Sequence, residues 1–195
     1  MQEVAMNQSL MDPKLIGLAA VAIVVIAVLA WMYVRKRRTS SAQLRQRFGP
    51  EYERAVRTHG SERRAEAKLA DREKRVGIMK IRELDAAERE RFSAQWVSLQ
   101  ARFVDYPKGA VTEAGELVSS LMQARGYPVT DFDQCAADIS VDHPKVVENY
   151  RSAHAIASRL ARGEASTEDL RSAMIYYRSL FEELVQMPLE TKAVA

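Results

Sequence analysis

The stretch Asp85–Phe103, DAAERERFSAQWVSLQARF, decides the fold expected for most of this chain. Asp85 and Glu88 have the spacing of a capping box, in which each side chain bonds the backbone N–H of the other residue at a helix start. Behind this cap, large apolar residues recur at the spacing of one helix face: Phe92, Trp96, Leu99 and Phe103. The stretch therefore predicts an amphipathic helix whose apolar face needs partners.

Three later segments supply such partners, each with apolar residues three or four positions apart. A helix opened by Pro107 carries Ala110, Ala114, Leu117 and Leu121, and one opened by Asp142-His143-Pro144 carries Val146, Tyr150, Ala153, Ala157 and Leu160. The last is capped by Ser166 to Asp169 and carries Leu170, Ala173, Tyr177, Leu180 and Leu184. A short helix opened by Asp131 lies between them. We expect an all-α protein with an antiparallel four-helix-type bundle over residues 83–186, followed by a flexible C-terminus at residues 187–195.

An uncharged apolar segment, Leu15–Val34, lies far upstream of this domain. Its twenty residues would span about 30 Å as a helix, the thickness of a bilayer's hydrocarbon core. The flank before it lacks the basic region of a signal peptide, and no A-x-A cleavage pattern follows. We therefore expect a retained, single-pass transmembrane helix.

Four basic residues follow this segment directly: Arg35, Lys36, Arg37 and Arg38. Cytoplasmic flanks of membrane helices collect Lys and Arg, so residues 1–14 should form a short external tail and the C-terminal domain should be cytoplasmic. The single cysteine, Cys135, fits a reducing compartment. The expected location is therefore the inner face of a plasma membrane.

The juxtamembrane region, residues 35–82, is strongly basic, with 16 basic and 6 acidic residues against 12 and 18 in residues 83–195. A basic arm near the membrane favours anionic inner-leaflet lipids, with Arg45 and Arg47 adding to the four basic residues above. Residues 41–57 form short helices whose apolar stripe could lie on the membrane or pack on the bundle, and both alternatives stay open. Residues 61–76 are so polar that we expect a solvated helical stalk.

Motifs of catalysis and nucleic-acid recognition are absent from the sequence. It has no glycine-rich phosphate loop, H-E-x-x-H, C-x-x-C or G-x-S-x-G, so we expect neither an enzyme nor a cofactor. The basic region has few interleaved aromatic residues, which argues against nucleic-acid binding. The nearest approach to a ligand or metal site is a set of polar residues between positions 127 and 154: Asp138, Asp142, His143 and His154.

Four stretches carry a resemblance to a known family: Leu44–Val56, Tyr127–Phe132, Ser140–His154 and Arg162–Val185. Together they resemble an uncharacterised family of bacterial single-pass membrane proteins with a C-terminal helical domain. The resemblance implies a bacterial plasma-membrane setting and supplies no catalytic residues. The chain departs from the family pattern at Tyr106-Pro107, where an Asp-Pro helix start would be expected.

The function that these observations favour is a membrane-tethered, non-enzymatic helical interaction or scaffold module with an unidentified protein partner. The alternative is a small-ligand or metal sensor built on residues 127–154. A pocket in which Asp138, Asp142 and His143 converge would distinguish the second reading from the first.

Overall fold

The structure is a computed structural model that describes residues 22, 24–29, 31, 32 and 41–186. Its contacts divide the chain into two compact units, residues 1–46 and residues 47–195. Within the described residues every regular element is a helix, which confirms the predicted all-α class.

The segment expected to cross a membrane is described only in part. Residues 22, 24–29, 31 and 32 are helical, and their large apolar side chains are exposed. Among all described positions, no helix has both the length and the apolar character that crossing a bilayer requires. The expected external tail, the basic cluster Arg35–Arg38 and the C-terminal tail from residue 187 lie outside the described residues.

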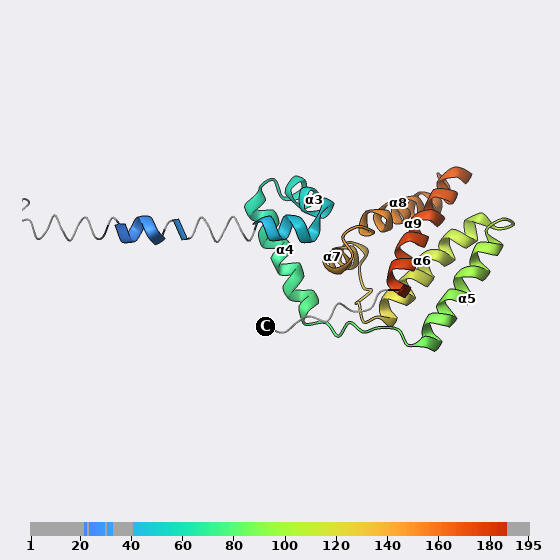
Figure 1. The fold of residues 1–195 in the computed structure, drawn as a ribbon. Coiled ribbons are helices and arrows are strands. Elements are labelled where there is room, and N and C mark those ends of the chain that lie inside the picture. The colour runs from blue at the N-terminus through green and yellow to red at the C-terminus, as the bar shows by residue number, and fades with distance from the viewer. Residues whose placement is uncertain (1–21, 23, 30, 33–40, 187–195) are drawn as a thin grey trace, which may run out of the picture. The chain divides into compact units, whose positions relative to one another are not determined.

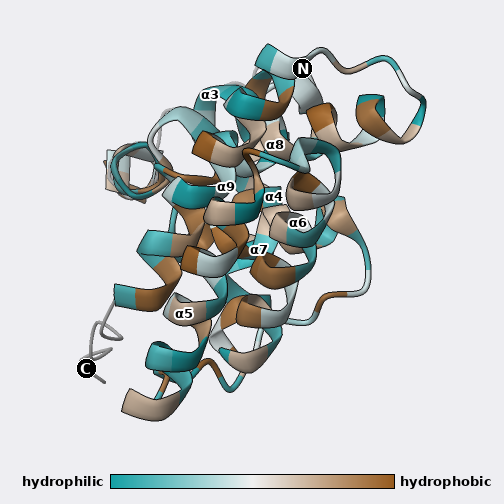
Figure 2. Cartoon of the chain, turned by 90° about the vertical axis from the view of Figure 1, so that its right-hand side faces the viewer, coloured by the Kyte–Doolittle hydropathy of each residue, from teal (hydrophilic) through white to brown (hydrophobic). Residues whose placement is uncertain are grey.

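Four long helices form a bundle in the second unit (Figure 1). They are α5 (Ala86–Arg102), α6 (Pro107–Ala124), α8 (Val147–Ala161) and α9 (Thr167–Gln186). Helix α9 is the central one, because it packs on α5, α6 and α8. Apolar and polar residues alternate along these helices as amphipathic packing requires (Figure 2).

Helices α6 and α9 pack closely although they run in the same direction. Gly115 of α6 lies beside Tyr177 of α9, and Arg125 just after α6 bonds Leu184 near the end of α9. The successive pairs α5–α6 and α8–α9 are antiparallel hairpins. Helices α6 and α9 therefore lie diagonally across the bundle and contact each other, and α5 and α8 lie on either side of them. This arrangement leaves a groove on either side of α6.

The predicted stripe residues fill the core of the bundle. Trp96 is 5% exposed, and its ring stacks on Phe181 of α9 with ring centroids 4.7 Å apart. The other predicted positions that are buried are Phe92, Leu99, Ala110, Ala114, Leu121, Val146, Tyr150, Ala153, Leu170, Ala173, Tyr177, Leu180 and Leu184. Phe103, Leu117, Ala157 and Leu160 are only partly buried, so the helical periodicity of the sequence located most of the core.

The predicted capping box at the start of α5 is confirmed. Asp85 accepts a hydrogen bond from the Glu88 backbone N–H at 2.7 Å, and Glu88 accepts one from the Asp85 N–H at 3.1 Å. Ser166 and Asp169 make the same reciprocal pair at the start of α9. Each box satisfies backbone donors that the first helical turn leaves unpaired.

The predicted start of α8 at Pro144 is wrong by three residues. Helix α7 (Phe132–Asp142), capped by Asp131 as predicted, continues through Asp142, and the His143 N–H bonds the Ile139 carbonyl at 2.8 Å. The chain then needs a turn before α8 begins at Val147. Asp142 and His143 therefore end α7 and do not cap α8.

A helical hairpin precedes the bundle and belongs to the same compact unit. Its helices are α3 (Pro50–His59) and α4 (Glu62–Gly77), and residues 41–48 before it are also helical. Its buried apolar residues lie outside the main core cluster: Phe48, Tyr52, Ala55, Ala65, Leu69 and Val76. Helix α4 also packs on α7, so it is not the solvated stalk expected from its composition.

The segment between α4 and α5 passes over the end of α6. The Arg82 N–H bonds the Arg125 carbonyl at 2.9 Å, and Gly126 follows with a φ of 94°. A Cβ at Gly126 would lie 2.4 Å from the Lys80 carbonyl oxygen, so this crossing requires glycine.

Candidate functional site

The polar residues predicted between positions 127 and 154 do not converge on one pocket. Asp138 on α7 bonds α4, and Asp142 accepts a hydrogen bond from the Tyr127 hydroxyl at 3.0 Å. No cluster of three or more His, Cys, Asp or Glu side chains suited to a metal ion occurs in the part of the chain that the structure describes. These carboxylates serve as acceptors for neighbouring elements.

The two histidines of this set also have separate surroundings. His143 Nδ1 lies 3.3 Å from a Glu183 oxygen of α9, and burial lowers the pKa of His143. His154 on α8 stacks on Phe132, with ring centroids 3.6 Å apart and an angle of 9° between the rings. Burial lowers the pKa of His154 too, so both rings favour the neutral form.

Where the hairpin meets α7 and α8, the structure joins the predicted Asp138 to four charged residues that were not singled out from the sequence. We call this cluster the ion-pair joint; it consists of Glu51, Arg72, Arg75, Asp138 and Arg151. Glu51 on α3 is its centre and is 2% exposed. Its carboxylate accepts hydrogen bonds from both terminal nitrogens of Arg151, one of them at 3.0 Å, and pairs with Arg72 at 3.4 Å.

Asp138 anchors the other half of the joint and is 0% exposed. Its Oδ1 accepts hydrogen bonds from Arg75 Nε at 2.7 Å, from Arg75 Nη2, and from Gln134 Nε2 at 3.0 Å. Oδ2 is buried and has no hydrogen-bond partner within the described residues. The hydrogen bonds to the Asp138 carboxylate therefore all end on one oxygen, and two of the three come from Arg75. The buried carboxylate thus depends strongly on Arg75.

Burial and ion pairing act in opposite directions on Arg72. The pKa of Arg72 is lowered chiefly by burial, although Glu51 opposes the shift. An arginine keeps its charge under such conditions, so the joint holds ionised groups away from water. Removing one partner of a buried ion pair leaves a charge that is poorly compensated, so loss of Glu51 or Asp138 should weaken the attachment of the hairpin.

A signal for this joint was present in the sequence. Ala65, Leu69, Arg72 and Val76 have the spacing of one helix face, so Arg72 occupies a position where a core residue would be expected. A charged residue in an apolar stripe points to a buried partner. The partner's identity could not be read, because Glu51 and Asp138 lie on other helices.

A second buried polar side chain, that of Arg125, hydrogen-bonds the C-terminal end of α9. Arg125 is 2% exposed, and its Nη1 donates to the Leu184 carbonyl at 2.6 Å. A cation at this end of a helix is favourable, because unpaired carbonyls make the end electronegative. Burial lowers the pKa of Arg125, while nearby Tyr127, Glu83 and Asp142 oppose that shift. Arg125 therefore holds α6 and α9 together.

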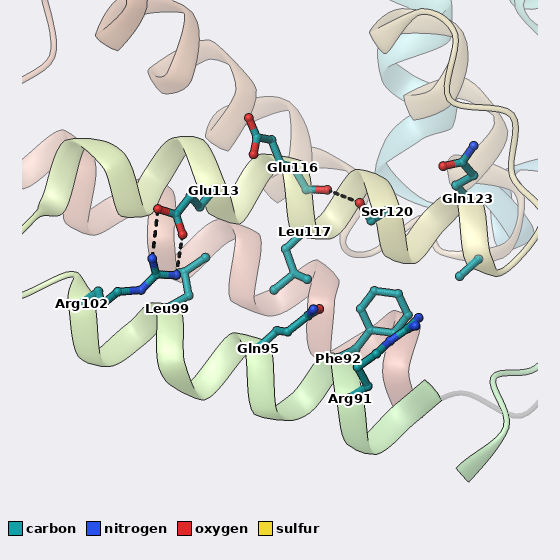
Figure 3. A pocket seen from close by; sticks show the side chains of 11 residues that line it. Arg91, Phe92, Gln95, Leu99, Arg102, Glu113, Glu116, Leu117, Ser120 and Gln123 are labelled. Atoms are coloured by element: carbon teal, nitrogen blue, oxygen red, sulfur yellow. Dashed lines mark hydrogen bonds and ion pairs between the residues drawn. The ribbon is translucent and has the colours of Figure 1, made fainter. Parts of the chain in front are cut away.

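The groove between α5 and α6 has a volume of about 560 Å³. Figure 3 shows that one end is closed by the Arg102–Glu113 ion pair, whose two contacts are 2.5 Å and 3.2 Å long. Leu117 and Phe92 supply its apolar surface. Polar side chains also line this groove: Arg91, Gln95, Glu116, Ser120 and Gln123.

The residues predicted to bind the membrane surface are described only from position 41. Arg45 is exposed, and Arg47 pairs with Glu73 of α4 at 3.2 Å. Phe48 and Tyr52 are buried, and the Tyr52 hydroxyl bonds Glu66 at 3.0 Å. Phe48 and Tyr52 therefore pack on protein within the hairpin.

Comparisons with protein-family models, with curated proteins and with solved structures give no match to this chain.

Proposed function

We propose that this chain is a membrane-tethered, non-enzymatic helical interaction module at the inner face of a bacterial plasma membrane. The observation that carries the proposal is the described part of the apolar segment. Its helix has exposed apolar side chains at Val24, Ile26 and Trp31, which are 61%, 65% and 60% exposed. Exposed apolar surface on this scale is unfavourable in water by about 25 cal/mol per Å², and lipid removes that penalty.

The charge of the following residues supports the orientation. Arg35 to Arg38 add four positive charges directly after Val34. Such charges favour the cytoplasmic side and attract anionic lipids by about 1 kcal/mol each near the surface. Because Phe48 and Tyr52 are buried, lipid attraction would come from arginine and lysine side chains and not from aromatic insertion.

The ion-pair joint supports a role in holding a partner in place. It connects α3 and α4, the helices of the hairpin, to α7 and α8. A bundle fastened in this way keeps a fixed orientation to the hairpin, as a tether requires. The bundle also exposes large apolar side chains at Val97, Val104 and Ile175, which are candidate contact positions for a protein partner.

The tether is tested by fractionation and by reporter fusions to the full chain. We expect the protein to resist alkaline extraction from membranes, and a reporter after Ala195 to be active only in the cytosol. The Val25→Lys/Ile26→Lys variant should be extracted, because each lysine at the helix centre disfavours insertion by about 2.5–3.5 kcal/mol. Extraction of the unaltered protein, or periplasmic reporter activity, would contradict the proposal.

The partner is tested by photo-crosslinking in cells. A photoreactive residue at position 97, 104 or 175 should give a discrete adduct, whereas one at exposed Glu168 serves as the control. The same adduct from all four positions would indicate collision and not binding. No adduct from any position would refute the interaction role.

A small-ligand module remains the second candidate, and one observation favours it. His154 lines a groove between α6 and α8, together with the hydroxyl-bearing side chains of Tyr150 and Tyr177. The metal-binding form of this alternative has no comparable support.

A further inference from the structure

The groove between α6 and α8 has the dimensions of a small-molecule site. Its volume is about 700 Å³, within the range of about 300–1,000 Å³ that is common for such sites. Two stripes with the same spacing face it, one from each helix: Lys108, Thr112, Gly115 and Ser119, and Tyr150, His154, Ala157 and Ala161. Four of these eight residues are glycine, alanine or serine, which leaves room for a flat molecule.

The floor of the groove carries a polar group without a partner. Tyr177 of α9 is 2% exposed, yet its hydroxyl has no hydrogen bond within residues 41–186. The hydroxyl reaches the groove because residue 115 is glycine; a Cβ there would lie 3.0 Å from the Tyr177 oxygen. The hydroxyl is not one of the fully buried polar atoms that lack a partner in the described residues, so it opens onto the groove. A ligand in the groove can therefore reach it and form a hydrogen bond in place of water.

His154 offers a second group at the same level of the groove. One face of its ring is covered by Phe132, and no hydrogen bond to either ring nitrogen occurs in the described residues. Because burial lowers the pKa of His154, the neutral ring can both donate and accept a hydrogen bond. Tyr177 and His154 together fit a ligand hydroxyl.

An exposed lysine lies at the end of the groove where α6 begins. Lys108 lies in the first turn of α6 and has no ion pair within the described residues. The start of α6 has no side-chain cap and no acidic residue in its first turn, so its backbone N–H groups add positive potential. Lys108 and Gly115 are seven residues apart, which corresponds to about 10 Å along the helix.

We infer that the α6–α8 groove binds a planar aromatic monocarboxylate about 10 Å long, with its carboxylate at Lys108 and a ring hydroxyl at Tyr177 and His154. The ring would lie between the small residues of the two helices. Glu116 also lines the groove, and its charge disfavours a ligand with a second acidic group. The inference does not depend on the membrane tether or on a protein partner, so a failure of one leaves the other standing.

The test uses the full chain in neutral-lipid nanodiscs, with empty nanodiscs to subtract partitioning. The probe is 4-hydroxycinnamate, compared with cinnamate, which lacks the hydroxyl, and with 4-hydroxycinnamamide, which lacks the carboxylate. Titration calorimetry and saturation-transfer NMR should show binding of 4-hydroxycinnamate. Loss of one hydrogen bond should weaken cinnamate about threefold to tenfold.

Matched variants assign the contacts. Tyr177→Phe should reduce the affinity for 4-hydroxycinnamate to that for cinnamate, whereas Tyr176→Phe, the neighbouring tyrosine outside the groove, should leave it unchanged. Lys108→Gln should weaken both acids and spare the amide, with Lys145→Gln as its control. Circular dichroism verifies that each variant is folded. Absence of binding up to about 10 mM, equal affinity for all three probes, or equal effects of the two tyrosine variants would overturn the inference.

Discussion

Glu51→Gln is the substitution that tests the ion-pair joint most directly. It keeps the shape of the side chain but removes the charge that faces Arg151 and Arg72. Breaking a buried pair from one side destabilises a protein by about 3–5 kcal/mol. The two arginine side chains retain 13% and 19% exposure, so some water reaches them, and we expect the lower end, about 3 kcal/mol.

The assay is urea unfolding of residues 41–186, followed by the fluorescence of Trp96, its only tryptophan. With a slope of about 2 kcal/mol per M, the midpoint should fall by about 1.5 M. If the hairpin detaches before the bundle unfolds, the urea midpoint from Trp96 fluorescence underestimates the stability that the hairpin has lost. Amide hydrogen exchange in α3 and α4 should then accelerate about a hundredfold.

Glu53→Gln is the matched control, because Glu53 lies on the same helix and is exposed. Its effect should stay within about 0.5 kcal/mol. The triple variant Glu51→Leu/Arg72→Met/Arg151→Met should recover most of the loss, since apolar side chains of similar size can replace a buried ionic cluster. Equal effects of Glu51→Gln and Glu53→Gln, in both unfolding and exchange, would refute the reasoning.

Three further predictions concern the bundle. Trp96→Ala should destabilise it by about 3–5 kcal/mol, because the stacked contact with Phe181 is lost; an unfolding midpoint near that of the unaltered chain would contradict this. Gly126→Ala should lower the free energy of unfolding by at least about 1–3 kcal/mol, because of the positive φ and the close Lys80 carbonyl; circular dichroism melts will measure it. His143 has a lowered pKa in the folded protein, so the unfolded chain binds its proton first as the pH falls through about 6.5, and stability decreases towards acid. His143→Gln should reduce the difference between unfolding midpoints at neutral and acidic pH, and an unchanged difference would show that His143 does not contribute.

The features predicted correctly from the sequence are those encoded within a single helix. A capping box involves residues three positions apart, and an apolar stripe repeats with the helical period, so both can be recognised locally. Asp85, Asp131 and Ser166 therefore marked helix starts, and Trp96 marked the core. The start of α8 was misplaced because Asp142, which has the chemistry of a cap, ends α7 and bonds the Tyr127 hydroxyl instead.

Only the tertiary structure decided where the charges are paired. Glu51 and Arg151 are 100 positions apart, and Arg75 and Asp138 are 63 apart, so no local pattern connects them. The polar composition of α4 predicted a solvated stalk, but a helix with few apolar residues can still be buried on one side when other helices supply opposite charges. The sequence could not show that His154 and Tyr177 line the same groove, because that groove forms only where α6 and α8 both pack on α9.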